Sequence, residues 1–123
     1  NNAFTGRVTA IEASDAGDGA SATVAVNVGG EALRVAADDV SATHVAVGDR
    51  LTFCVRPEYL RIDAGESRLA ATVASAEFLG ETTRVTLDWG GRDLVVRTRD
   101  PLSGEVVVGF DPEDAHVIGV DGA

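Results

Sequence analysis

The sequence has no lysine and no methionine, one cysteine, and few aromatic residues among its 123 residues. Its ten basic residues are all arginine and face twenty acidic residues, which gives a formal net charge of −10. Contacting nucleic acid through its phosphates requires clusters of lysine and arginine, so the charge argues against a nucleic-acid partner. The single cysteine, Cys54, excludes an internal disulfide, and its apolar neighbours predict a buried, unreactive thiol.

Several motifs of catalysis and membrane insertion are also missing. No run approaches the roughly 20 apolar residues that cross a bilayer, and no signal peptide is visible. No glycine-rich loop precedes Lys-Ser or Lys-Thr, so there is no P-loop for nucleotides. His44 and His116 lack a metal-ligand spacing with each other or with Cys54, and Ser67 and Ser75 lack catalytic partners. The sequence therefore predicts no enzyme, no metal site and no cofactor.

The excess of acid without lysine, over a core rich in Ala and Val, is typical of a protein from a salt-saturated cytoplasm. Like charges on a small domain repel one another at low ionic strength. At about 1 M salt the screening length falls to roughly 3 Å, and this repulsion nearly vanishes. The alternative is an ordinary acidic protein that lacks lysine by chance.

The halophile hypothesis predicts a strong effect of salt on stability. We expect the melting temperature to climb steeply between about 0.05 M and about 2 M KCl, because salt screens the carboxylates and strengthens burial of the aliphatic core. Thermal unfolding followed by circular dichroism at each concentration measures this. The total stability of a domain is only about 5–15 kcal/mol, so repulsion among many carboxylates should affect it visibly. A melting temperature that stays constant within about 3 °C over this salt range would contradict the hypothesis.

Most of the sequence predicts β-strand, and the pattern occurs twice, over about 4–63 and 69–121. In each repeat a strand with period-two alternation leads to a Gly-Gly pair that marks a hairpin turn. The expected strands are 6–12, 22–28, 32–36 and 51–55 in the first repeat, and 71–77, 83–89, 93–97 and 106–110 in the second. A repeat of this length indicates one supersecondary unit used twice.

The predicted fold class is all-β, in one domain over residues 1–123. About eight to ten strands, paired mostly as hairpins, are expected to close into a pair of small OB-like or SH3-like barrels, either with or without exchange of strands between the halves. The glycines within the strands, Gly6, Gly80 and Gly109, are expected to mark bulges or sharp bends. The longest loop is expected at 15–21, and the one short helix around 37–43.

Four motifs occur in order along the chain. They are Asn2-x-Phe4-x-Gly6, then Val47-Gly48-Asp49 before Arg56-Pro57-Glu58, then Glu77-Phe78-Leu79-Gly80-Glu81-Thr82, and finally Gly104 before Asp111-Pro112-Glu113. Together they resemble the TOBE domain, the tandem OB-like C-terminal extension of the ATP-binding subunits of ABC-type importers. The maltose, polyamine, sulfate and ferric-ion importers are the most similar in pattern. The resemblance covers essentially the whole chain.

The resemblance implies a non-catalytic regulatory and dimerisation domain that supports import of a small solute. In that family an ATPase domain precedes this region and performs hydrolysis. The expected partners are that ATPase domain, a second copy of the subunit and, indirectly, the membrane permease subunits. The chain would then be the C-terminal fragment of a longer ATPase subunit, located in the cytoplasm at the inner face of the plasma membrane. A stand-alone homologue is the alternative.

Two sets of residues are the candidates for a structural or regulatory role. The first is the pair of Pro-Glu corners, Arg56-Pro57-Glu58 and Asp111-Pro112-Glu113, where proline ends a strand and holds two charges on a rigid turn. Arg56 is suited to pairing with a carboxylate, in a loop or across a dimer, or else belongs to a solvated corner. The second set, Gly80, Glu81 and Thr82, is either a simple turn or a contact for a small polar ligand.

A second function remains open, that of a free-standing cytoplasmic OB-like protein that binds an oxyanion. Related domains that bind molybdate or tungstate resemble a Ser-x-Arg-Asn pattern whose amides and hydroxyls donate to the oxyanion. Here Ser67 and Arg68 fit that pattern only loosely. Leu69 stands where an asparagine is needed, and Glu66 adds a negative charge.

Overall fold

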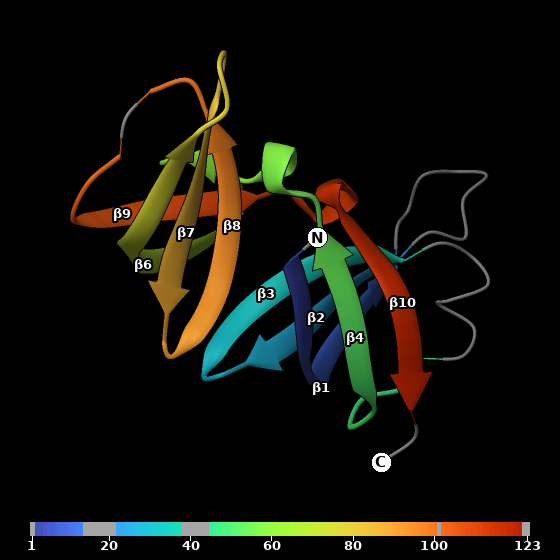
Figure 1. Cartoon of the computed structure of the whole chain (residues 1–123). Helices are drawn as coiled ribbons and strands as arrows, with labels where there is room; N and C mark the ends of the chain where they lie inside the picture. Colours follow the sequence, from blue (N-terminus) through green and yellow to red (C-terminus); the bar gives the residue numbers. More distant parts are fainter. Residues whose placement is uncertain (1, 14–21, 38–44, 101, 122–123) are drawn as a thin grey trace. The chain divides into compact units, whose positions relative to one another are not determined.

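The computed structural model describes residues 2–13, 22–37, 45–100 and 102–121 (Figure 1). These residues form strands, two single-turn 3-10 helices and the connections between them, which confirms the all-β prediction. The expected loop at 15–21 and nearly all of the expected helix at 37–43 lie outside the described residues. Within the described ranges, no helix is long and apolar enough to span a bilayer.

The elements follow the expected order, with two further strands. They are β1 (Asn2–Ala13), β2 (Ala22–Val28), β3 (Glu31–Ala37), β4 (Arg50–Val55), η1 (Pro57–Tyr59), β5 (Arg61–Ile62), β6 (Ser67–Phe78), β7 (Thr83–Trp89), β8 (Arg92–Thr98), β9 (Glu105–Phe110), η2 (Pro112–Asp114) and β10 (Ala115–Asp121). Strands β2 and β7 have the bounds that the alternation predicts. Strands β1 and β6 are each longer at both ends than expected.

The strands divide into two compact units, each with a five-stranded sheet. The terminal unit, residues 3–54 and 111–121 of the described chain, has the strand order β10-β4-β1-β2-β3. The central unit, Asn2 with residues 55–110, has the order β5-β9-β6-β7-β8. The two orders match strand for strand, since β1, β2, β3 and β4 occupy the places that β6, β7, β8 and β9 occupy in the other sheet.

The last part of each half of the sequence belongs to the sheet of the other half. Turn η1 and strand β5 follow β4 in the chain, yet β5 pairs with β9 and η1 contacts β8, both in the central unit. Turn η2 and strand β10 follow β9, yet β10 neighbours β4 and η2 contacts β3, both in the terminal unit. Of the two arrangements that the repeat pattern left open, the chain adopts the one with strands exchanged between the halves.

Alternating side chains build one apolar core in each unit. In β7, Val85, Leu87 and Trp89 are buried while the residues between them face outward, because successive strand residues point to opposite faces. The terminal unit is organised in the same way, and its Phe4 and Phe53 rings stack with centroids 5.0 Å apart. Apart from Ala22, the buried apolar side chains of β2 are all valine, which suits the pleated surface.

The two Gly-Gly pairs form two-residue hairpin turns, as predicted. Gly29 and Gly30 have φ of 59° and 91°, and Gly90 and Gly91 repeat these values closely at 57° and 85°. In each turn the side chain two residues before the first glycine accepts a hydrogen bond from the second glycine's amide, at 3.0 Å. Positive φ at both central positions matches the right-handed twist of the flanking strands, which explains why glycine occupies them.

The expectation that glycines mark the bulges is wrong. The register shifts lie at Val8–Ala10 in β1 and at Val73–Ser75 in β6. Gly6 and Gly109 instead allow another backbone to approach closely. A Cβ on Gly109 would lie 2.0 Å from the carbonyl oxygen of Ala64, and one on Gly6 would lie 2.1 Å from that of Asn27. Gly80 lies beyond the end of β6, in the turn to β7.

The prediction for the cysteine also needs correction. Cys54 is a free thiol and is only half-buried. Its neighbours Phe53 and Val55 face the core, because β4 alternates and an even-numbered residue of this strand points to the opposite face. An apolar run therefore did not guarantee burial of every residue in it.

Candidate functional site

Both Pro-Glu corners fold as a single 3-10 turn directly after a strand. In the first, the amide of Tyr59 donates to the carbonyl oxygen of Arg56 at 2.9 Å. In the second, the amide of Asp114 donates to the carbonyl oxygen of Asp111 at 2.9 Å, and the Asp114 carboxylate accepts from the Asp111 amide at 2.9 Å. Proline at the first position of each turn has the fixed φ that such a turn needs.

The charges on the two corners are used differently. At the second corner the aspartates at both ends of the turn hydrogen-bond the backbone, so they stabilise the turn itself. At the first corner Arg56 and Glu58 are exposed, and neither makes an ion pair within the residues that the structure describes. Glu113 is likewise exposed. The charged side chains of the first corner are therefore exposed on the surface and do not stabilise their own turn.

The candidate residues Gly80, Glu81 and Thr82 lie at the tip of the β6–β7 hairpin. The amide of Leu79 donates to the carbonyl oxygen of Thr82 at 2.7 Å, and Gly80 has a φ of 107°. Two large apolar side chains stand beside this turn with much of their surface in solvent, Phe78 at 73% and Leu79 at 44%. The tip thus combines apolar contact area with polar turn groups.

The candidates Ser67 and Arg68 point to opposite faces of β6. Ser67 is buried on the core side, as is Leu69, whereas Arg68 is exposed and donates from Nε to the carbonyl oxygen of Gly65 at 3.1 Å. Strand alternation therefore keeps the hydroxyl and the guanidinium apart. The two groups do not converge on one position.

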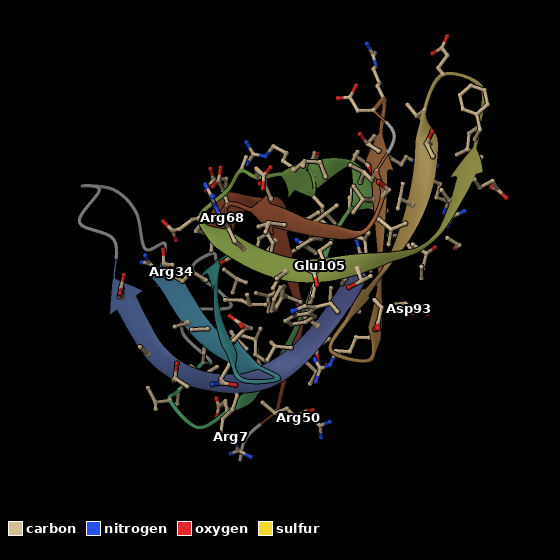
Figure 2. The ribbon with its side chains drawn as sticks, turned by 90° about the vertical axis from the view of Figure 1, so that its left-hand side faces the viewer. Arg7, Arg34, Arg50, Arg68, Asp93 and Glu105 are labelled. Atoms are coloured by element: carbon tan, nitrogen blue, oxygen red, sulfur yellow. The ribbon has the colours of Figure 1, made fainter. Side chains whose placement is uncertain are left out.

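Most other charged groups are spread over the surface (Figure 2). Arg34 on β3 pairs with Glu12 on β1, and both side chains are exposed. Arg7 donates to the carbonyl oxygen of Gly48 at 3.0 Å. Exposed ion pairs of this kind contribute about 0–1 kcal/mol each. No group of three or more side chains within the described ranges could hold a metal ion.

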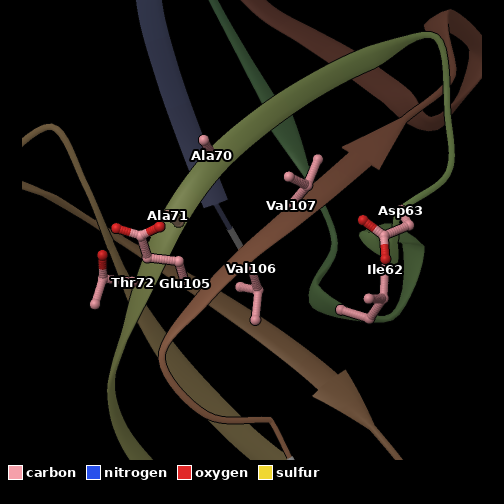
Figure 3. A pocket seen from close by; sticks show the side chains of 8 residues that line it. All are labelled: Ile62, Asp63, Ala70, Ala71, Thr72, Glu105, Val106 and Val107. Atoms are coloured by element: carbon pink, nitrogen blue, oxygen red, sulfur yellow. The ribbon is translucent and has the colours of Figure 1, made fainter.

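The central unit also has a cavity that the sequence did not reveal. Its volume is about 460 Å³, within the roughly 300–1,000 Å³ typical of small-molecule sites. It lies over β5, β6 and β9, and Figure 3 shows the side chains that line it. The lining residues are Ile62, Asp63, Ala70, Ala71, Thr72, Glu105, Val106 and Val107.

With this geometry in view, comparison with known proteins identifies the family. The model of the TOBE domain family matches residues 53–118, which is more than half of the chain. The chain belongs to the TOBE domain family. The matched segment contains both Pro-Glu corners, the tip of the β6–β7 hairpin and the cavity of the central unit.

One curated relative and one solved structure place the domain further. The chain is 38% identical over 76 residues to the sn-glycerol-3-phosphate import ATP-binding protein UgpC of Burkholderia ambifaria, covering 62% of this chain and 21% of that protein. The chain thus spans about a fifth of the relative that it matches. It also superposes on the cytoplasmic molybdate-binding protein ModG with a TM-score of 0.76, at 20% identity, covering 100% of this chain and 96% of that one. The second likeness establishes the OB-like fold.

Proposed function

We propose that this TOBE domain is the non-catalytic regulatory and dimerisation region of an ABC-type importer's ATP-binding subunit. The observation that carries the proposal is the 38% identity to UgpC, whose name describes it as an import ATP-binding protein. Under this proposal the ATPase domain lies on the N-terminal side, and the subunit acts in the cytoplasm against the permease subunits at the membrane. The imported solute is then small, as it is for that relative.

Two surfaces are suited to contact with a second copy or with the ATPase domain. The first corner offers the exposed charges of Arg56 and Glu58, and the hairpin tip offers Phe78 and Leu79. Large aromatic and aliphatic side chains are typical of interface cores, and charged groups are typical of the polar rim. These residues are proposed as contact points, with Asp111, Pro112 and Glu113 maintaining the equivalent turn in the terminal unit.

The first test of the proposal concerns nucleotide. We expect that the isolated chain neither binds nor hydrolyses ATP, because its sequence has no phosphate-cradling loop and the described part of the chain has no group of side chains suited to a metal ion of the kind that phosphoryl transfer requires. Isothermal calorimetry with ATP and Mg²⁺ measures binding, and the gene sequence upstream of Asn1 shows whether an ATPase domain is encoded in frame. Saturable ATP binding, or an upstream region without that domain, would contradict the assignment.

The second test concerns self-association. We expect a weak dimer, with an interface below about 1,200 Å² of total buried area, because few large apolar side chains are exposed among the residues that the structure describes. Sedimentation velocity at rising protein concentration measures it, in about 2 M KCl so that the repulsion between two acidic chains is screened. Replacing the exposed Phe78 by serine is expected to weaken the dimer. A protein that stays strictly monomeric at millimolar concentration rules out pairing by this domain alone.

Oxyanion binding is the second candidate function, and the superposition on ModG over the whole chain favours it. In this chain, however, Ser67 faces the core and Arg68 the solvent, so the loosely matching residues do not assemble a donor set. Calorimetric titration with molybdate separates the two functions, since tight saturable binding would support the free-standing binding protein.

A further inference from the structure

The cavity of the central unit is formed where β9 lies between β5 and β6. Across β9 and β6, Val107 is opposite Ala70 and Glu105 is opposite Thr72. On the other side of β9, the amide of Asp63 donates to the carbonyl oxygen of Val107 at 2.8 Å. Asp63 therefore lies at the register of Val107, two residues along the strand from Glu105. Two strand residues span about 6.6 Å along β9.

The lining has an apolar middle with one carboxylate toward each end. In Figure 3, Glu105 and Thr72 lie together at one end and Asp63 and Ile62 lie at the other. Between them, Val107 is opposite Ala70 on the face of Glu105, while Val106 points to the other side of β9. None of the eight lining residues is basic. A small anion would therefore meet repulsion here, whereas a cation with an aliphatic body would find a complementary surface.

Both carboxylates are available to a ligand. Neither Asp63 nor Glu105 makes an ion pair or a side-chain hydrogen bond with any residue that the structure describes. Asp63 has a φ of 54°, and it is the non-glycine residue with positive φ among the described positions. Aspartate tolerates this conformation better than most residues. The backbone conformation and the Asp63–Val107 hydrogen bond together fix the position of the Asp63 Cβ, from which the carboxylate extends.

We propose that this cavity binds a short alkyl diamine of four or five carbons as the diammonium ion. One ammonium group donates hydrogen bonds to the Asp63 carboxylate. The other donates to the Glu105 carboxylate and to the hydroxyl of Thr72, while the methylene chain lies over Val107 and Ala70, which are on the same face of the sheet as Glu105 and Thr72. Charge-assisted hydrogen bonds at both ends select the length of the ligand, and burial of its methylene groups against the apolar middle of the cavity favours binding. This inference stands on the cavity alone and does not depend on the importer assignment.

The test is a titration of the full 123-residue chain with 1,4-diaminobutane at constant ionic strength, followed by amide chemical shifts and by calorimetry. We expect saturable binding, with shift changes confined to residues 62–63, 70–72 and 105–107. Butylamine has the same carbon chain with one ammonium group, and 1,2-diaminoethane has both charges on a shorter chain. Each should bind about fivefold more weakly, the factor expected for losing one partly exposed charge pair.

Two near-isosteric variants test the two ends separately. Asp63→Asn keeps a residue that tolerates positive φ, and Glu105→Gln keeps the length of the side chain. Each should weaken 1,4-diaminobutane about fivefold and remove most of its advantage over butylamine. Asp93→Asn is the control for net charge, because Asp93 is exposed on β8 and does not line the cavity (Figure 2). The affinity of Asp93→Asn for 1,4-diaminobutane should be unchanged.

Three results would overturn the proposal. The first is the absence of saturable binding. The second is equal affinity for the diamine and for butylamine, or shift changes spread over the acidic surface, since either shows attraction to net charge only. The third is an equal loss of affinity in Asp93→Asn and in the two cavity variants. Because Asp63→Asn and Glu105→Gln lie on different elements, misfolding of one leaves the other to decide.

Discussion

Replacing Gly109 by alanine is expected to destabilise the protein by about 3 kcal/mol or more, at the upper end of what overpacking costs. The added Cβ would lie 2.0 Å from the carbonyl oxygen of Ala64 and 2.6 Å from that of Ser67. Both obstacles are backbone atoms, which cannot rotate away as a flexible side chain can. The strand β9 would have to move away from the chain around residues 64–67, and the pairing of β9 with β5 would be lost.

The matched control is Gly119→Ala in β10. Apart from Gly119 and its two chain neighbours, no described residue has an atom within 4 Å of the position that this Cβ would occupy. The free energy of unfolding of this variant should therefore lie within about 0.5 kcal/mol of that of the natural protein. Gly6→Ala meets the carbonyl oxygen of Asn27 at 2.1 Å and should behave like Gly109→Ala, but in the terminal unit. Urea unfolding measured by circular dichroism gives the three free energies. Equal stability of the Gly109 and Gly119 variants would contradict the close approach described for β9.

Replacing Asn2 by alanine is the second change with a large expected effect, about 3 kcal/mol in the free energy of unfolding. The Asn2 side chain is buried and pairs with β8 as a strand would. Its Nδ2 donates to the carbonyl oxygen of Val95 at 2.8 Å, and its Oδ1 accepts from the Val95 amide at 2.7 Å. A third contact runs from Nδ2 to the carbonyl oxygen of Val55 at 3.3 Å. Alanine leaves these backbone groups without their partners.

Asn27→Ala is the control, because Asn27 is exposed and accepts one hydrogen bond, from the amide of Gly30 at 3.0 Å. It should cost about 0.5–1 kcal/mol. The melting temperature of Asn2→Ala should fall by roughly 10 °C in differential scanning calorimetry, given the usual entropy of unfolding for a chain of this size. Asn2→Asp should be at least as harmful, since it replaces a donor with a charge facing two carbonyl oxygens. A loss no larger than that of Asn27→Ala would show that the Asn2 contacts contribute little.

The sequence predicted the hairpins well because their signals are local. Period-two alternation fixes which residues of β2 and β7 face the core, and consecutive glycines fix the turns that follow. The same local reasoning failed for Gly6 and Gly109. A glycine within a strand is consistent both with a bulge and with a close approach by another backbone, and only the three-dimensional neighbours decide between them.

The candidate site was less predictable, for a physical reason. The Pro-Glu corners are continuous in sequence, so proline and the flanking charges revealed them before the fold was known. The cavity takes its lining from β5, β6, β9 and the residue after β5, and no spacing in the sequence relates Asp63 to Glu105. For Ser67 and Arg68, adjacency in sequence was misleading as a guide to convergence, because neighbouring residues in a strand point to opposite faces.

The exchange of the last strand between the two halves has a consequence for synthesis on the ribosome. All segments of the central unit, Asn2 and residues 55–110, have been made once Phe110 is added to the chain. The terminal unit begins earlier but is completed last, because β4 neighbours β10 and β10 consists of residues 115–121. Until then one edge of β4 has no partner, and unpaired edges invite pairing with other chains. Premature termination shortly after Phe110 would therefore leave a complete central unit attached to a terminal unit that is prone to aggregate.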